Sequence, residues 1–332
     1  MRIGVIGLGR IGRYHAEVVR EHPDVRGLVV TDVDAARARR VAEELGAELA
    51  EDVDSLLGRA DAVVIASSTD SHAALIRRAV DAGLPTFCEK PVALDLAATI
   101  EVVRHVRDAG GTVQIGFQRR FDPAYQAARQ AVADGTLGRP YLIRLVGHDH
   151  VPPHESYIPL SGGMFRDLHI HDFDIARWLL GQDVVEVYVQ AAVLADPMFA
   201  KYGDVDTVAA TLTFSGGTLG VVTGARHDAV GYDVRFELFG SRDSVSVGLN
   251  GRMPLRSLEA GMPTGPEKPY AGFLDRFDEA YRRELGAFVD VALGRIPNPC
   301  GVEDAEVALR VALACERSRA EHRPVEVAEV TP

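Results

Sequence analysis

Short apolar runs alternate with helix-like periodicity over the first 120 residues of the chain. The apolar runs, which predict β-strands, occupy residues 2–7, 25–32, 61–66, 84–89 and 112–117. Helices are expected between the strands. One follows the first strand and ends at about Glu21, another runs from about Ser71 to Ala82, and a third runs from Asp95 to Ala109. Because strands that alternate with helices form parallel sheets, the pattern predicts an α/β fold with a doubly wound parallel sheet.

The pattern changes near residue 120, where longer β runs replace the strand–helix alternation. After a helix over 121–134, strands are expected at 139–149, 183–194, 206–214, 217–226, 232–240 and 244–249. The sequence FSGG at 214–217 predicts a hairpin turn, and two amphipathic helices are expected at about 275–293 and 302–320. The sequence therefore predicts a dinucleotide-binding Rossmann domain over 1–119 and an α+β domain over 120–332, with a large, mainly antiparallel open sheet.

The first strand runs into a glycine motif that is typical of dinucleotide binding. Gly7, Gly9 and Gly12 form G-x-G-x-x-G with Arg10 and Ile11, and Asp32 ends the second strand 20 residues after Gly12. Glycines at this spacing let the backbone approach a pyrophosphate at a helix N-terminus, and the acid accepts hydrogen bonds from ribose hydroxyls. Asp32 would repel a 2′-phosphate, so NAD is predicted over NADP. Arg37, Arg39 and Arg40 could bind such a phosphate, but a solvated helix face is the favoured interpretation.

Polar residues follow the other strands of the first domain. Ligands of such sheets gather at the carboxyl ends of the strands, so these residues are candidate cofactor contacts: Ser67, Ser68, Thr69, His72, Glu89, Lys90 and Gln118. Lys90 precedes Pro91, which holds its backbone out of the helical region and leaves the ammonium able to reach a ligand. A surface lysine in a turn is the alternative.

Residues 161–181, SGGMFRDLHIHDFDIARWLLG, combine glycine, acid and imidazole in one expected helix. Asp167 and His171 are four residues apart and share a helical face, so the carboxylate can orient the imidazole. Gly162 and Gly163 allow close backbone approach at the start, and Gly181 stands where a C-terminal cap belongs. A purely structural Asp–His pair is the alternative.

Composition restricts the partners of the chain. The net charge of −12 over 332 residues disfavours nucleic acid and anionic membrane surfaces, and no apolar stretch is long enough to span a bilayer. The three cysteines form no C-x-x-C pair, and the chain enters its first strand without a secretion signal. A cytoplasmic protein without a metal site is expected. Apolar residues on an uncovered face of the second sheet predict that another subunit covers that face.

These motifs together resemble the Gfo/Idh/MocA family of oxidoreductases, and within it the bacterial inositol 2-dehydrogenases. The resemblance rests on GLGRIG, Asp32, EKP at 89–91, GFQRRFDPAY at 116–125, GGMFRDLHIHDFD at 162–174 and GYDVRFELFGS at 231–241. It implies NAD-dependent oxidation of a secondary ring alcohol of a cyclic polyol, myo-inositol or a close relative, to the ketone. It also implies that Lys90, Asp167 and His171 are catalytic and contact the substrate, and that Arg120 and Tyr232 are further substrate contacts.

In the implied mechanism, His171 is the general base, Asp167 orients it, and Lys90 stabilises the developing alkoxide. Lys90 and His171 could exchange roles. Other family members leave alternatives open: another sugar or polyol dehydrogenase, an NAD-dependent glycosidase, or a non-enzymatic cofactor-binding regulator.

One loop departs from the resemblance. Many inositol dehydrogenases have a sequence like SRDPAPPP where this chain has GHDHVPPH at 147–154, so His148 and His150 replace an arginine and a proline. A polyol or sugar other than inositol therefore stays open as the substrate. With His154 these residues could suggest a metal site, but they lack zinc-ligand spacing, and His169 and His171 point in different directions on their helix.

Overall fold

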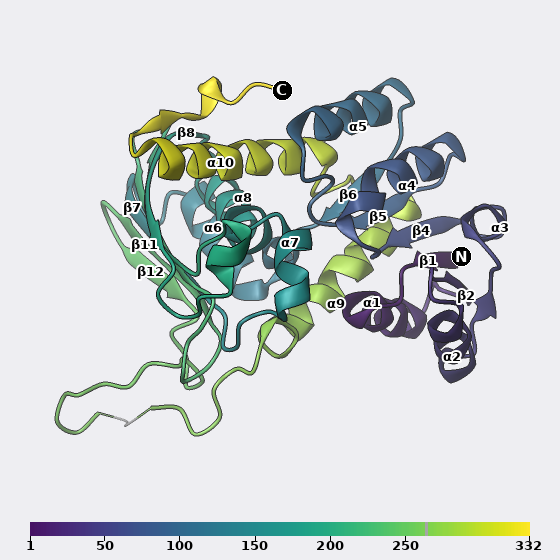
Figure 1. Ribbon diagram of the computed structural model, residues 1–332, viewed down its shortest axis with the longest axis horizontal. Coiled ribbons are helices and arrows are strands. Elements are labelled where there is room, and N and C mark those ends of the chain that lie inside the picture. The colour runs from purple at the N-terminus through teal and green to yellow at the C-terminus, as the bar shows by residue number, and fades with distance from the viewer. Residues whose placement is uncertain (263–264) are drawn as a thin grey trace. The chain divides into compact units, whose positions relative to one another are not determined.

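A six-stranded parallel sheet forms the centre of the N-terminal part of the chain, in the order β3-β2-β1-β4-β5-β6 (Figure 1). The computed structural model describes residues 1–262 and 265–332. The strands are β1 (Arg2–Ile6), β2 (Gly27–Thr31), β3 (Glu48–Leu49), β4 (Ala62–Ile65), β5 (Thr86–Glu89) and β6 (Val113–Gly116). This order, with β1 and β4 adjacent, confirms the doubly wound sheet that the alternation predicts.

The helices of this sheet differ in how they begin. They are α1 (Arg10–Glu21), α2 (Ala35–Leu45), α3 (Val53–Leu57), α4 (Thr69–Asp81) and α5 (Leu96–Asp108). Asp34, Asp52 and Asp95 cap α2, α3 and α5 through their side chains, as short acids at N-caps do. By contrast, the described residues supply no side-chain cap for α1 or α4. The N-terminal N–H groups of those two helices are therefore the ones suited to a ligand.

A helix from far along the sequence completes this first core. Leu285, Phe288 and Val289 of α9 (Phe273–Ala292) are buried together with the apolar side chains of β1 and β2. For this reason residues 1–118 and 279–307 form one compact unit, and residues 119–278 and 308–332 form the other. This grouping differs from the continuous division at residue 119, because the buried face of α9 packs on the parallel sheet.

The second unit is built on a seven-stranded sheet in the order β12-β11-β7-β10-β9-β8-β13. Its strands are β7 (Pro140–His148), β8 (Val184–Ala192), β9 (Thr207–Phe214), β10 (Leu219–Ala225), β11 (Asp233–Gly240), β12 (Ser244–Val247) and β13 (Val325–Glu326). Only the β7–β10 pair is parallel among the described pairs, so the expected mainly antiparallel sheet is confirmed. The expected hairpin is also present, with the Phe214 N–H donating to the Thr218 carbonyl at 3.0 Å.

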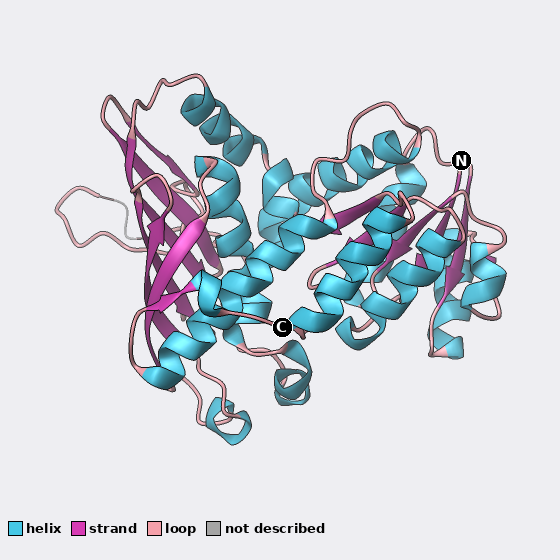
Figure 2. Ribbon diagram, turned by 90° about the horizontal axis from the view of Figure 1, so that it is seen from above, coloured by secondary structure: helices cyan, strands magenta, loops and turns pink. Residues whose placement is uncertain are grey.

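Helices cover one face of this sheet in the described part of the chain (Figure 2). They are α6 (Pro123–Ala133), α7 (Ile158–Ser161), α8 (Ile170–Leu180) and α10 (Val302–Glu321). Short helical turns lie at Gln118–Phe121, Glu155–Tyr157, Phe199–Tyr202 and Val327–Glu329. The alternating burial of β9 and β10 shows that one face is packed and the other is more open. No described helix is both long and apolar enough to cross a membrane.

The segment at 161–181 differs in one respect from the single α-helix expected. Gly162 and Gly163 have φ of 83° and 84°, and a π-helical turn, Phe165–His169, precedes α8. The φ of Gly163 favours glycine, and a Cβ there would crowd Oδ1 of Asp204 at 3.1 Å, the oxygen that accepts a hydrogen bond from the Met164 N–H. Gly181 ends the helix at φ 62°, as expected. Single π turns within helices are frequent at functional sites.

Candidate functional site

The glycine loop is tightly packed at two positions and open at the third. A Cβ on Gly7, whose φ is 88°, would lie 2.6 Å from Cα of Ser67, and one on Gly12 would lie 2.0 Å from the Gly7 carbonyl oxygen. A Cβ on Gly9 would meet nothing within 4 Å. Gly9 is the N-cap of α1, and Arg10 and Ile11 begin that helix. The loop thus fits a pyrophosphate bound against Gly9 at the helix N-terminus.

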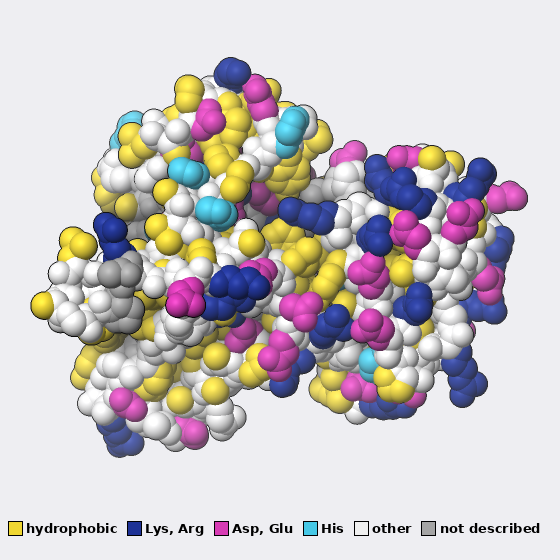
Figure 3. Space-filling view, turned by 90° about the horizontal axis from the view of Figure 1, so that it is seen from below, with side chains coloured by type: hydrophobic (Ala, Val, Ile, Leu, Met, Phe, Trp, Pro, Cys, Tyr) yellow, Lys and Arg dark blue, Asp and Glu magenta, His cyan; other side chains and the backbone are white. Residues whose placement is uncertain are grey.

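Asp32 lies against this loop. Its side chain is 3% exposed, Oδ2 accepts a hydrogen bond from the Leu8 N–H at 2.6 Å, and Oδ1 accepts one from the Asp34 N–H at 2.8 Å. Arg37 donates to both Asp32 and Asp34, at 3.3 and 3.4 Å, so its charge is engaged by acids. Arg39 and Arg40 are exposed. The surface of this unit, at the right of Figure 3, intersperses basic and acidic groups. These contacts favour NAD over NADP.

The loops after β4 and β5 are braced by a buried histidine. His72 is 1% exposed, its Nδ1 contacts the Pro91 carbonyl at 2.8 Å, and its Nε2 contacts the Ser67 carbonyl at 3.1 Å. Burial lowers the pKa of His72. Ser68 is the N-cap of α4 and Thr69 its first residue. Both ring nitrogens of His72 therefore face backbone carbonyls and brace the two loops, and its contact with a cofactor stays a prediction.

Glu89 and Lys90 are also fixed from within the first unit. Oε1 of Glu89 lies 2.7 Å from Nε2 of His15, and Oε2 accepts the Lys90 N–H at 3.3 Å. His15 is fully buried, packed edge-on against Phe87. Gln118 is 3% exposed, and its Oε1 has no hydrogen-bond partner among the described residues. A buried amide oxygen in that state is suited to a ligand donor.

In the second unit, one buried guanidinium joins two carboxylates. Arg226 is 4% exposed, and it donates to Oδ2 of Asp167 at 2.9 Å and to Oδ2 of Asp149 at 3.1 Å. Oδ1 of Asp167 accepts the Tyr157 hydroxyl at 3.0 Å. Burial, together with the nearby Asp167, raises the pKa of Asp149, although Arg226 opposes the shift. Asp167 is thus held in one orientation by two donors from different segments.

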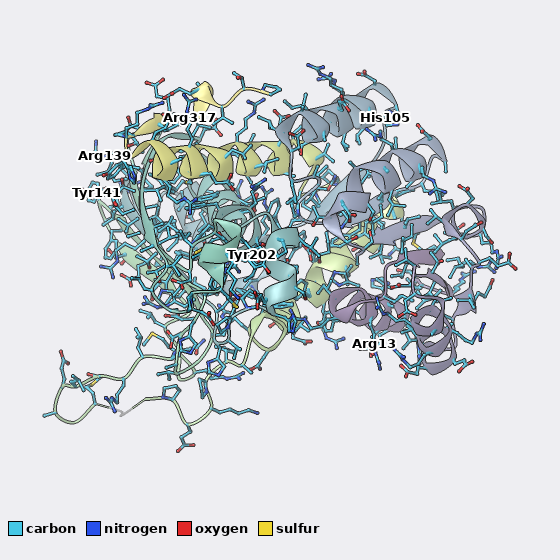
Figure 4. The ribbon with its side chains drawn as sticks, in the orientation of Figure 1. Arg13, His105, Arg139, Tyr141, Tyr202 and Arg317 are labelled. Atoms are coloured by element: carbon cyan, nitrogen blue, oxygen red, sulfur yellow. The ribbon has the colours of Figure 1, made fainter. Side chains whose placement is uncertain are left out.

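The segment that carries Tyr157 is anchored to the unit. Lys201 and Tyr202 contact Oε1 of Glu155 at 3.0 and 3.4 Å, and Tyr202 is marked in Figure 4. The hydrogen bond from Lys201 lowers the pKa of Glu155. The short helical turn that carries Tyr157 is therefore held in place by the ion pair between Glu155 and Lys201.

The two histidines of the π turn and α8 occupy different environments. His171 is half-buried in the first turn of α8. His169 is fully buried, and its Nδ1 contacts Oδ2 of Asp172 at 2.8 Å, while Oδ1 of Asp172 accepts from Arg119. Burial alone would raise the pKa of Asp172, but Arg119 and His169 lower it. His169 is part of the core, which leaves His171 as the more accessible imidazole.

The two expected substrate contacts are both buried. Arg120 donates from Nε and Nη2 to Asp174 at 2.9 and 2.5 Å, and it is 5% exposed. Tyr232 is 6% exposed, and burial raises the pKa of its hydroxyl. The bidentate pair engages Arg120 within the unit, so its substrate contact stays a prediction.

The three histidines of the divergent loop have separate partners. Nδ1 of His148 lies 3.4 Å from Asp228 Oδ2, Nδ1 of His150 lies 2.9 Å from the Asp228 carbonyl, and Nδ1 of His154 lies 2.8 Å from Ser156 Oγ. Within the described residues, no group of three or more His, Cys, Asp or Glu residues could hold a metal ion.

Sequence reasoning missed the residues that support the candidate site residues, namely Asp149, Arg226, Tyr157 and His15. Asp149 and Arg226 were only the last residues of two expected strands, and those strands are paired in parallel with Ala225 opposite His148. Polar residues at adjacent strand ends would have been the available signal. No pattern in the sequence connects Tyr157 or His15 with its partner.

Known proteins are similar to this chain over its whole length. Residues 1–117 match the family described as "Oxidoreductase family, NAD-binding Rossmann fold", and residues 125–246 match the "GFO/IDH/MocA C-terminal domain". The myo-inositol 2-dehydrogenase of Thermotoga maritima is 38% identical, with 99% of each chain covered.

Two solved structures show the same likeness. A putative myo-inositol dehydrogenase of Sinorhizobium meliloti has a TM-score of 0.91 at 36% identity, covering 98% of this chain and 99% of that one. The scyllo-inositol dehydrogenase of Lactobacillus casei, solved with NAD(H) and scyllo-inositol, has a TM-score of 0.90 at 29% identity, covering 99% of each chain. The glycine loop, Asp32 and these matches make the chain an NAD-dependent dehydrogenase that belongs to the Gfo/Idh/MocA family of oxidoreductases.

Proposed function

We propose that the protein oxidises a secondary ring alcohol of a cyclic polyol, myo-inositol or a close relative, to the ketone. The observation that carries the proposal is the fixed carboxylate of Asp167, held by Arg226 and Tyr157 four residues before His171. The inositol dehydrogenases of similar sequence and fold support the substrate class.

The glycine loop and Asp32 would hold the cofactor. Gly9 leaves space for the pyrophosphate, and Asp32 lies beside it as an acceptor for ribose hydroxyls. When NAD is bound, its nicotinamide accepts the hydride that leaves the alcohol carbon. The protein must then remove one proton from the hydroxyl and stabilise the oxygen that loses it.

We assign the proton to His171. A neutral imidazole can take a proton near physiological pH, and a nearby carboxylate stabilises the imidazolium that forms. Asp167 supplies that carboxylate, and its two hydrogen bonds keep it oriented. Lys90 stabilises the developing alkoxide with its ammonium. An exchange of roles between Lys90 and His171 is the alternative.

The test is NADH formation, measured by absorbance, with a panel of polyols, sugars and aryl glycosides. We expect NADH from cyclic polyols with NAD. Release of aglycone without net NADH would instead indicate a glycosidase that recycles its cofactor. Cofactor binding with no turnover on the whole panel would indicate a regulator.

We also propose that the enzyme works in the cytoplasm as a homodimer or homotetramer. Cys88, Cys300 and Cys315 are buried free thiols, which is typical of a reducing compartment. The open face of the seven-stranded sheet carries Leu219, which is 56% exposed, and such a face is suited to cover by a second copy.

A further inference from the structure

Two buried histidines hold the chain on either side of Lys90. The Lys90 N–H donates to Oε2 of Glu89 at 3.3 Å, and Oε1 of Glu89 lies 2.7 Å from Nε2 of His15. On the other side, the Pro91 carbonyl lies 2.8 Å from Nδ1 of His72. His15 is 0% exposed and His72 is 1% exposed. The backbone that carries the Lys90 ammonium is therefore bracketed by two imidazoles from the protein interior.

Both imidazoles come from the helices that are suited to a ligand. His15 lies in α1, whose N-cap is Gly9, and His72 lies in α4, whose N-cap is Ser68. Among the described residues, no side chain caps either helix. A pyrophosphate bound at the N-terminus of α1 would thus rest on the same helix that orients Glu89. The position of Lys90 is in this way tied to the helix that would hold the cofactor.

His15 makes a single polar contact inside an apolar cage. An ionised carboxylate only accepts hydrogen bonds, so Nε2 of His15 carries the proton in the contact with Glu89. Its Nδ1 is buried and has no hydrogen-bond partner among the described residues. The ring packs against Phe87, Tyr281 and Tyr14, with centroids 5.5, 5.8 and 6.1 Å away. An apolar side chain would fill this cage without an unsatisfied nitrogen, so the one hydrogen bond to Glu89 is what the imidazole contributes.

The Glu89 carboxylate has little room to move. Glu89 ends β5 and lies opposite Gly116 of β6, and a Cβ on Gly116 would lie 3.1 Å from its Oε2. Its side chain is 12% exposed. The carboxylate therefore lies over a glycine that leaves space for it, with His15 on one oxygen and the Lys90 N–H on the other. A shift of His15 would be passed to the peptide from which the ammonium extends.

We infer that His15 is a positioning residue for Lys90, which acts through Glu89 and fixes the ammonium relative to the helix that binds the cofactor. The inference rests on the proposed oxidation of a cyclic polyol, in which Lys90 stabilises the developing alkoxide. Its effect is on the chemical step, because a displaced ammonium stabilises the alkoxide less while the glycine loop and Asp32 stay in place.

The experiment compares His15→Leu with His15→Gln, using myo-inositol and NAD. Leucine fills the cage without a donor, and glutamine keeps an N–H that can reach Glu89. In His15→Leu, kcat should fall by about 10- to 100-fold, while the dissociation constant of NADH, from fluorescence titration, stays near that of the wild type. His15→Gln should recover most of kcat. If His15→Gln is as impaired as His15→Leu, the hydrogen bond is not what matters and the inference is overturned.

His105→Leu is the matched control. Nε2 of His105, marked in Figure 4, lies 2.8 Å from Oδ1 of Asp81, so the variant also removes a histidine–carboxylate contact within the first unit. This pair is more exposed and adjoins neither Glu89 nor Lys90 in sequence. His105→Leu should keep the kcat of the wild type. Thermal unfolding reports at which temperature all variants are folded, and the kinetics are measured there.

The Glu89→Ala variant tests the same contact from the other side. It should also lower kcat, and His15→Leu added to it should cost no further kcat, because the two residues act through one hydrogen bond. If His15→Leu does not fold, Glu89→Ala alone decides. Wild-type kcat in His15→Leu or in Glu89→Ala overturns the inference and leaves the proposed function standing. A wild type that oxidises no cyclic polyol overturns both.

Discussion

The backbone N–H of Leu8 donates to Oδ2 of Asp32 at 2.6 Å. This contact ties the acid at the end of β2 to the glycine loop, so the position of the carboxylate and the shape of the loop are linked. Arg37 approaches the same oxygen at 3.3 Å. Selection between NAD and NADP therefore depends on Asp32, whose carboxylate also pairs with Arg37.

Asp32→Ala should narrow the preference for NAD. The change removes the charge that repels a 2′-phosphate and releases Arg37 to bind one, so NADPH affinity should rise by about tenfold or more relative to NADH. Fluorescence titration with NADH and NADPH measures the ratio. In the control Asp32→Ala/Arg37→Ala, the part of the gain in NADPH binding that comes from Arg37 should disappear. Equal affinity of the wild type for both cofactors would contradict the assignment.

His171→Ala should lower turnover on the active polyol by at least about 100-fold, the lower range for loss of a general base. NADH affinity should stay near that of the wild type, because the glycine loop and Asp32 lie in the other unit. Lys90→Ala should reduce turnover as much or more, since it removes charge stabilisation of the alkoxide. Steady-state kinetics and NADH titration provide the two readouts.

His169→Ala is the control for this assignment. His169 is fully buried and bonded to Asp172, so its loss should cost about 1–3 kcal/mol of stability and have only a mild effect on the turnover of folded protein. Urea unfolding and kinetics at a temperature where both variants are folded separate the effects. Equal losses of turnover in His169→Ala and His171→Ala would mean that the base is misassigned.

The sequence predicts the elements better than it predicts their partners. Strand and helix periodicity identifies the parallel sheet, the second sheet and α9, because burial imposes a period on the side chains. It cannot show that the face of α9 with Leu285 and Phe288 packs on the first sheet. Any apolar surface could bury that face of α9, so the surface that does so is determined by the fold of the whole chain.

The same limit applies to the candidate site. The spacing of Asp167 and His171 is local and visible in the sequence, but the bridge from Arg226 to Asp149 depends on the parallel pairing of β7 and β10. A pattern of 3.6 residues per turn cannot reveal a π turn. The sequence therefore does not predict that α8 begins only after Phe165–His169.

Asp206 supports a prediction on acid stability. Its carboxylate accepts the N–H groups of Leu194, Ala195 and Asp196 at 2.8 to 2.9 Å. Burial alone would raise its pKa, but these bonds and the Thr207 hydroxyl lower it below the ordinary 3.8. A lowered folded-state pKa means that the contribution to stability is present above pH 3.8 and lost as pH falls through the folded-state value.

Asp206→Asn should therefore destabilise the protein by about 1–3 kcal/mol near pH 7, because the amide NH₂ must face donors. The gap from the wild type should shrink as pH falls below 3.8, where the unfolded wild type begins to bind a proton at Asp206, and should level off below the lowered pKa of the folded state. Urea unfolding across this range measures it. Asp95→Asn is the control, since an N-cap that accepts one bond at 2.8 Å works equally well with an amide oxygen. A gap that stays constant with pH would count against the assignment.

The open face of the seven-stranded sheet leads to a prediction on assembly. Leu219 of β10 is 56% exposed and lies opposite Leu142 of β7, which in turn lies opposite Phe239 of β11. Tyr141, 47% exposed, and Arg139, 5.5 Å from its ring, are at the start of β7 (Figure 4). This apolar stripe is suited to burial by the same stripe of a second copy.

Leu219→Arg should therefore lower the mass measured by light scattering, because two like charges would meet across a symmetric interface. Leu49→Arg, at a residue 39% exposed in β3 of the other unit, controls for added charge and should leave the mass unchanged. A wild type that is monomeric at micromolar concentration rules out assembly. An assembled Leu219→Arg variant places the interface elsewhere, because a charge in the stripe is incompatible with its burial against a copy of itself.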